Sequence, residues 1–234
     1  MKFIKDKIDL GAESFEETQV SDAALEARLA ALTERLAELP KSGDPIVSTE
    51  LELEQAQILL ELERADEAWQ IARASFDTAI TAQGWVPAVR ACEILFLCEH
   101  PESLAALGQG VWLAVTFPID PELTLSMLQH IIEETPSDSD GAAVAAAAAA
   151  YVVDLRAEGK QHDELYFFAT QMLGAVARRH SGIEEQHEFD AWMNKFELYD
   201  PQRFLVRLRN IVDVLVQDNW WFDADKVRAK LPIQ

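Results

Sequence analysis

Helical periodicity, with small residues at regular positions, is the feature that most constrains the fold of this chain. It is clearest between residues 51 and 82. Ala56 and Leu59 lie on adjoining faces of the first helix in this stretch, with glutamates outward. A polar join at 64–67 follows, in which Asp66 is the expected N-cap of the next helix. The stripe of that second helix consists of Ala65, Ala68, Trp69, Ala72, Phe76, Ala79 and Ile80. Two antiparallel helices approach closely only where side chains are short, so the stretch predicts a tight helical hairpin.

The same stretch resembles one unit of the tetratricopeptide repeat, a helical hairpin that stacks into solenoids. The small, large, small, small and large positions of that pattern are matched by Ala56, Leu59, Ala68, Ser75 and Phe76. The Trp-x-x-Leu-Gly start of the repeat is missing, because Glu52, Gln55 and Ala56 stand there, and Glu63 replaces the usual glycine. The resemblance implies a helical-repeat scaffold, and a generic helical hairpin is the alternative.

The rest of the chain shows further helical stripes and no sustained two-residue alternation, so we expect an all-α fold. The helices are predicted near 22–38, 48–63, 65–82, 86–98, 102–116, 121–134, 142–158, 162–179, 184–197 and 201–217. A proline at the first helical position, after a capping aspartate, marks two starts, at Asp120-Pro121 and Asp200-Pro201. About ten helices make a helical-repeat α-solenoid or an irregular multi-helix bundle. We expect a flexible arm at 1–20, then a single domain at 21–234 with a possible sub-boundary near 135–141.

Two segments are expected to pack tightly among their neighbours. Residues 142–150 are nearly all alanine, which suits a helix covered on every side. Gly108-Gln109-Gly110 lacks the third glycine of a dinucleotide motif, so helix contact explains its glycines better.

The helix near 162–179 has an inner face predicted to hold Leu165, Phe168, Ala169, Met172, Leu173 and Val176.

The composition is strongly acidic. The 41 acidic and 20 basic residues of the 234-residue chain give a formal net charge of −21. The electric field of this negative charge repels nucleic acid and anionic lipid, and it favours a basic partner or simple solubility. No secretory signal follows Met1 and no apolar run reaches about 18 residues, so we expect a cytoplasmic protein without a membrane segment. Cys92 and Cys98 are predicted to be buried thiols, joined neither by a disulfide nor by a metal.

The sequence offers little support for catalytic chemistry, so we expect a non-enzymatic protein without a cofactor. No serine lies in a Gly-x-Ser-x-Gly motif, and histidines are few. The best alternative is a helical metal-binding or enzymatic bundle that uses His180, Glu184 and His187. Gly182 interrupts the helix between these residues, which argues against a shared metal ion.

The C-terminal region offers the strongest candidate for partner binding. Arg203 and Arg207 form a basic stripe opposite the apolar face of one helix, and Trp220, Trp221 and Phe222 follow its end. Three consecutive aromatic residues cannot all face one way, and arginine and tryptophan are frequent binding hot spots. We therefore expect an interaction module, such as a scaffold, adaptor or assembly chaperone, that binds a protein or peptide. A structural subunit of a larger complex is a further alternative.

Overall fold

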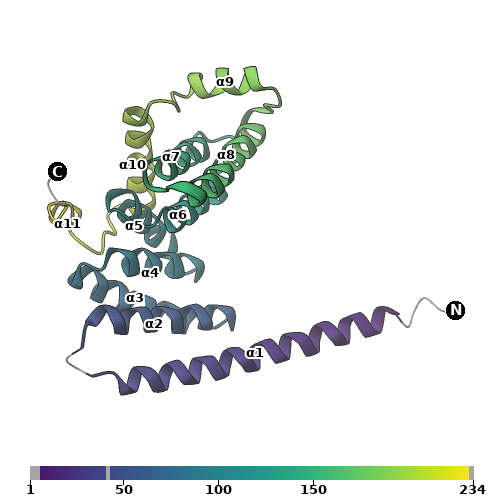
Figure 1. Ribbon diagram of the computed structural model, residues 1–234, viewed down its shortest axis with the longest axis vertical. Coiled ribbons are helices and arrows are strands. Elements are labelled where there is room, and N and C mark those ends of the chain that lie inside the picture. The colour runs from purple at the N-terminus through teal and green to yellow at the C-terminus, as the bar shows by residue number, and fades with distance from the viewer. Residues whose placement is uncertain (1–5, 41–42, 232–234) are drawn as a thin grey trace.

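The computed structural model describes residues 6–40 and 43–231, and for residues 6–20 it describes the backbone alone. This part of the chain is helical throughout and contains no strand (Figure 1). None of its helices combines the length and the apolar character needed to cross a membrane. The helices are α1 (Asp6–Glu38), α2 (Pro45–Glu61), α3 (Ala65–Ala82), α4 (Trp85–Leu97), α5 (Ser103–Thr116), α6 (Pro121–Glu134), α7 (Gly141–Arg156), α8 (Gly159–Ser181), α9 (Gln186–Lys195), α10 (Pro201–Val216) and α11 (Ala224–Arg228).

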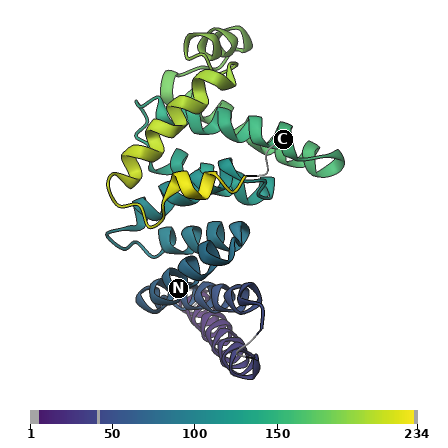
Figure 2. The same cartoon turned by 90° about the vertical axis from the view of Figure 1, so that its left-hand side faces the viewer.

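Most helices pack against their neighbours in chain order. The closest pairs are α2 with α3, α4 with α5 and α6 with α7, and α3 also packs on α4 and α7 on α8. Helix α10 departs from this order, because it packs on α5 and α7. Figure 2 shows α10 and the C-terminal segment crossing one face of the stack. The predicted all-α, multi-helix fold is confirmed.

The positions of the predicted helices are also confirmed, with one large difference at the N-terminus. Helix α1 begins at Asp6 and not near residue 22. Of the predicted arm, residues 1–5 lie outside the described part of the chain, and the backbone from Asp6 onward is helical. In the second half of α1, Leu29 and Leu32 are buried where the helix packs on α2.

Local capping explains where several helices begin. The Asp120 carboxylate accepts the Glu122 N–H at 2.8 Å at the start of α6, and Asp200 accepts the Gln202 N–H at 3.0 Å at the start of α10. Both carboxylates bind N–H groups that have no partner within the helix. The cap predicted at Asp66 is wrong, because α3 already begins at Ala65 and Asp66 lies in its first turn.

Arginines from neighbouring helices close two helix C-termini. Arg156, at the end of α7, donates to the carbonyl oxygens of Ala114 at 2.8 Å and Val115 at 2.9 Å near the end of α5. Arg179 on α8 donates to the Ile132 carbonyl oxygen near the end of α6 at 3.0 Å. The last carbonyls of a helix lack intrahelical partners and carry partial negative charge. The two guanidinium groups therefore tie successive hairpins together.

The α2–α3 hairpin is packed as its sequence predicts. Ala56 on α2 and Ala68 and Ala72 on α3 are fully buried. Next to them, the Ser75 hydroxyl of α3 donates to the Glu52 carboxylate of α2 at 3.0 Å. Short side chains thus allow the two helices to touch along their length.

Helix α5 depends on two glycines at close crossings. A Cβ at Gly108 would lie 2.6 Å from Val216 Cγ2 and 3.0 Å from Leu215 Cβ of α10. A Cβ at Gly110 would lie 2.6 Å from Cys92 Cβ of α4. Side chains could not occupy these positions without moving a neighbouring helix. The expected role of these glycines in helix contact is confirmed.

The alanine run of α7 is buried on all sides, also as predicted. Every residue from Ala142 to Ala149 is at most 4% exposed. Helices α6, α8 and α10 all pack on it. A hydrophobic core extends from Leu29 in α1 to Val227 in α11 around these central helices.

We expect Ala68→Leu to lower the free energy of unfolding by about 1–3 kcal/mol, because the added carbons must displace atoms in a filled contact. Denaturant unfolding followed by circular dichroism measures this loss. Ala74→Leu is the matched control on the exposed side of α3, and it should change stability by less than about 0.5 kcal/mol. Equal losses in the two variants would contradict the packing of the hairpin.

Gly108→Ala and Gly174→Ala should change stability in opposite directions. At Gly108 the clash with α10 should outweigh the gain in helix propensity, for a net loss of about 1–2 kcal/mol. At Gly174 on α8 a Cβ would meet only Arg178 Nη1, at an ordinary 3.6 Å. That variant should therefore gain about 0.5–1 kcal/mol. A gain in both variants, measured by the same unfolding experiment, would show that α10 does not pack closely on Gly108.

Candidate functional site

The three residues of the proposed metal site do not form a ligand set. His180 is largely buried at the end of α8, where its Nε2 lies 3.3 Å from Asp140 Oδ1. Glu184 and His187 are exposed beyond Gly182, which has a φ of 64° and turns the chain away from α8. Among the side chains that the structure describes, in residues 21–40 and 43–231, no group of three His, Cys, Asp or Glu residues is placed to hold a metal.

The two cysteines are buried free thiols, as predicted. Burial, together with the charge of Asp66, raises the pKa of Cys98 to about 11. Burial also raises the pKa of Cys92 well above its usual value. The thiolate is the nucleophilic form of cysteine, so both side chains are poor nucleophiles near neutral pH.

The two arginines of the predicted C-terminal site have partners within the chain. Arg203 pairs with Glu197 and with Asp200, whose carboxylate lies 3.4 Å from its Nε. Arg207 donates to the Phe196 carbonyl oxygen at 2.7 Å and lies 3.4 Å from the Asp140 carboxylate. Arg207 thus links the α9–α10 connection to the start of α7.

The three C-terminal aromatic residues are half-buried against α3 and α5. Trp221 packs edge-on against Phe76, with ring centroids 5.3 Å apart, and the Arg73 guanidinium lies 4.3 Å from its ring centroid. The backbone N–H of Trp221 donates to the buried Gln109 side chain at 2.8 Å. Trp220 and Phe222 pack against Trp112, with ring centroids 6.0 Å and 5.5 Å away.

The structure does not bring the two halves of this predicted site together. Arg203 and Arg207 lie in the first half of α10, and the aromatic residues follow its far end. A helix rises 1.5 Å per residue, so Arg203 is about 20 Å from the end of α10. Partner binding by these five residues stays a prediction, whereas their contacts within the chain hold helices together.

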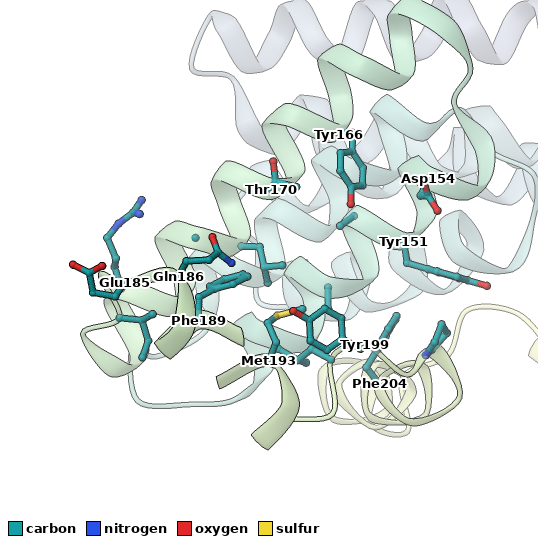
Figure 3. A pocket seen from close by; sticks show the side chains of 18 of the residues that line it. Tyr151, Asp154, Tyr166, Thr170, Glu185, Gln186, Phe189, Met193, Tyr199 and Phe204 are labelled. Carbon is teal, nitrogen blue, oxygen red and sulfur yellow. The ribbon is translucent and has the colours of Figure 1, made fainter. Parts of the chain in front are cut away.

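A groove lies between α7, α8, α9 and the start of α10, and its volume is about 570 Å³ (Figure 3). It exists because α8 packs closely on α7 but only marginally on α9. Its buried lining includes Leu173 of α8, Met193 of α9 and Phe204 of α10. We call this cavity the α8 groove.

The more exposed lining of the α8 groove consists of aromatic rings and of charged side chains that are mostly acidic. Two of the three tyrosines that line it are exposed, Tyr166 from α8 and Tyr199 from the α9–α10 connection, and the third is Tyr151 of α7. The carboxylates that line it are those of Asp154, Glu184 and Glu185, and Arg178 is the basic residue. These side chains leave a net negative charge beside an apolar interior.

Tyr199 is held by the neighbouring helix. Its hydroxyl donates to Asp190 Oδ1 of α9 at 3.4 Å. The same oxygen accepts from the Gln186 side chain at 2.9 Å. Partial burial and the Asp190 charge raise the pKa of Tyr199, so its phenol stays protonated and remains a donor.

The first half of α8 exposes three consecutive aromatic residues. Tyr166, Phe167 and Phe168 are 40%, 66% and 46% exposed. No residue in 159–168 is buried. The expectation that Phe168 lies on the inner face of this helix is therefore wrong, because no helix in the described part of the chain covers its side.

Sequence reasoning overlooked this cluster although a signal was present. Three consecutive aromatic residues cannot all share one face of a helix, and this holds for residues 166–168 as it does for Trp220, Trp221 and Phe222. At least one residue in 166–168 is therefore predicted to be exposed.

We expect Trp221→Ala to destabilise the protein by about 3 kcal/mol, toward the low end for a large aromatic residue because the side chain is half-buried. Thermal and denaturant unfolding measure this loss. Phe167→Ala is the matched control, since its ring is largely exposed, and it should cost less than about 0.5 kcal/mol. A wild-type melting temperature for Trp221→Ala would mean that the C-terminal segment does not stabilise α3 and α5.

Comparison with known proteins found no matching family model, no matching curated protein and no matching solved structure. The tetratricopeptide-like pattern of the α2–α3 hairpin stays a resemblance of one helical pair. The function of the α8 groove is therefore inferred from its own shape and chemistry.

Proposed function

We propose that this protein is a non-enzymatic interaction module, and that its α8 groove binds an amphipathic, basic helical segment of another protein. The observation that carries the proposal is the uncovered aromatic surface of α8. Tyr166, which lines the groove, is 40% exposed, and Phe167 next to it in the chain is 66% exposed, a large apolar area to leave in contact with water. Exposed apolar patches of this kind mark interaction surfaces.

The packing of the other helices supports a helix as the occupant. Helices α3 and α5 are each covered by the next helix in the chain, as α7 is by α8. Helix α8 lacks such a cover, because α9 contacts it only marginally. A helix from a partner would supply the missing neighbour, as in other helix-in-groove complexes.

The chemistry of the groove favours an amphipathic segment. Apolar side chains on one face would contact the buried residues Leu173, Met193 and Phe204. Polar side chains at the edge of that face would meet Asp154 and Glu184. Such a segment gains from burial of apolar area and keeps its charges in water.

Charge supports a basic partner and argues against a second copy of this chain. The net charge of −21 makes two copies repel each other, whereas it attracts a basic segment. The carboxylates that line the groove also outnumber the single guanidinium of Arg178. Complementary charge raises the rate of association and excludes acidic competitors.

We expect Thr170→Arg to weaken partner binding by at least about 2 kcal/mol, or roughly 30-fold in Kd, because Thr170 lines the groove and the variant places a bulky cation where a basic segment must bind. The measurement compares proteins captured from an extract by wild-type and variant protein, then the affinity of the captured partner. A photo-crosslinker placed at residue 166, which also lines the groove, identifies the bound segment.

Val214→Arg is the matched control, since Val214 on α10 is 70% exposed and lies outside the groove. It should capture the same partner at the wild-type level. Equal capture by Thr170→Arg and wild type would overturn the proposal. Cross-links to an acidic segment, or to a second copy of this chain, would overturn the proposed partner class.

A further inference from the structure

We propose that the space between Tyr166 and Tyr199 in the α8 groove receives one lysine or arginine side chain of the bound segment. This inference rests on the proposed function and adds the residue type that the groove recognises. The two tyrosines, with Asp154 beside Tyr166, would surround the cation with aromatic rings and a carboxylate (Figure 3).

The tyrosine rings are placed to face a ligand. Tyr166 points from α8 into the cavity, and Tyr199 lies across from it (Figure 3). His162 stacks on Tyr166 with ring centroids 5.3 Å apart and an interplanar angle of 11°, so it covers one face of that ring. The other face is left for the groove. A cation within about 6 Å of a ring centroid is attracted by the ring's quadrupole.

The positions of the two rings are set by polar contacts. The Tyr199 hydroxyl is bound to Asp190 on α9. On the opposite side, His162 lies 3.4 Å from Asp154 and 3.6 Å from Asp163. A site whose side chains are already held in place binds a ligand with less loss of conformational entropy.

Local charge at this end of the groove favours a cation. Asp154 lines the cavity there, and its carboxylate, which is 69% exposed, adds negative charge beside Tyr166. Lys160 is the nearby lysine, and it pairs with Glu164 at 3.1 Å. Arg178, the only basic residue among the described lining residues, lies twelve residues further along α8 than Tyr166. That separation is about 18 Å, beyond the screening length at physiological salt.

The test uses two synthetic probes that differ at one position. Both are short, capped amphipathic helices of leucine and glutamine, and one carries a single central lysine where the other has glutamine. A single charge avoids general attraction to so acidic a protein. The lysine probe should bind wild-type protein about tenfold more tightly than the glutamine probe in a fluorescence anisotropy titration.

The tenfold preference for the lysine probe should disappear in the double variant Tyr166→Leu/Tyr199→Leu. In Asp154→Asn the preference should shrink at least threefold, whereas the affinity for the glutamine probe should not change. Glu122→Gln removes an exposed carboxylate on α6, outside the groove, and should keep the full preference. Melting temperatures of all variants are measured first, so that loss of fold is recognised.

The outcomes separate this inference from the proposed function. Equal affinity of wild type for the two probes, including no binding of either, overturns the lysine pocket. A tenfold preference that survives the double tyrosine variant overturns it as well. If the probes bind equally but Thr170→Arg abolishes binding of both, the interaction module stands without the lysine pocket. If Thr170→Arg leaves binding of both unchanged, the α8 groove is not the binding surface and both proposals fail.

Discussion

The close crossing of α10 over α5 is the contact on which the C-terminal half of the structure depends. It is possible because Gly108 has no side chain where Val216 and Leu215 of α10 approach. The short alanine side chains of α7 likewise allow α10 to pack closely on that helix. Small residues therefore let a late helix lie across the stack and bring Trp221 to α3, far away in sequence.

The α8 groove follows from the same arrangement. Helix α7 is already covered by α6 and α10, so α8 meets it on one remaining side. The turn at Gly182 then carries the chain away from α8, and α9 returns only as far as the groove edge. Tyr166 and Phe167 are left in water because no later element of the described chain reaches them. The proposed binding surface is thus the place where the stack lacks its next helix.

The distribution of the few basic residues adds to the acidic character of the surface. Arg156 and Arg179 bind carbonyl groups at helix ends, and Arg207 binds the Phe196 carbonyl. These guanidinium groups hold helices together, and they contribute less positive charge to the outer surface than unbound arginines would. The carboxylates, in contrast, are mostly exposed. A basic partner would find complementary charge over most of the molecule, and would find aromatic rings together with that charge at the α8 groove.

The sequence by itself determined most of the helices, and it determined their starts where a capping aspartate precedes a proline, because capping and periodicity act within a few residues. Asp120 and Asp200 begin α6 and α10 as predicted, and the alanines of α7 and the glycines of α5 already indicated close helix contacts. Which side of a helix is covered was decided by tertiary structure alone. Two runs of three aromatic residues look alike in sequence, at 166–168 and 220–222. The second run is half-buried because Gln109 and α3, more than a hundred residues away, lie beside it, whereas the first run has no such neighbour. A stripe of apolar residues indicates that one side of a helix must be buried. Whether another part of the same chain buries that side depends on the path of the whole chain.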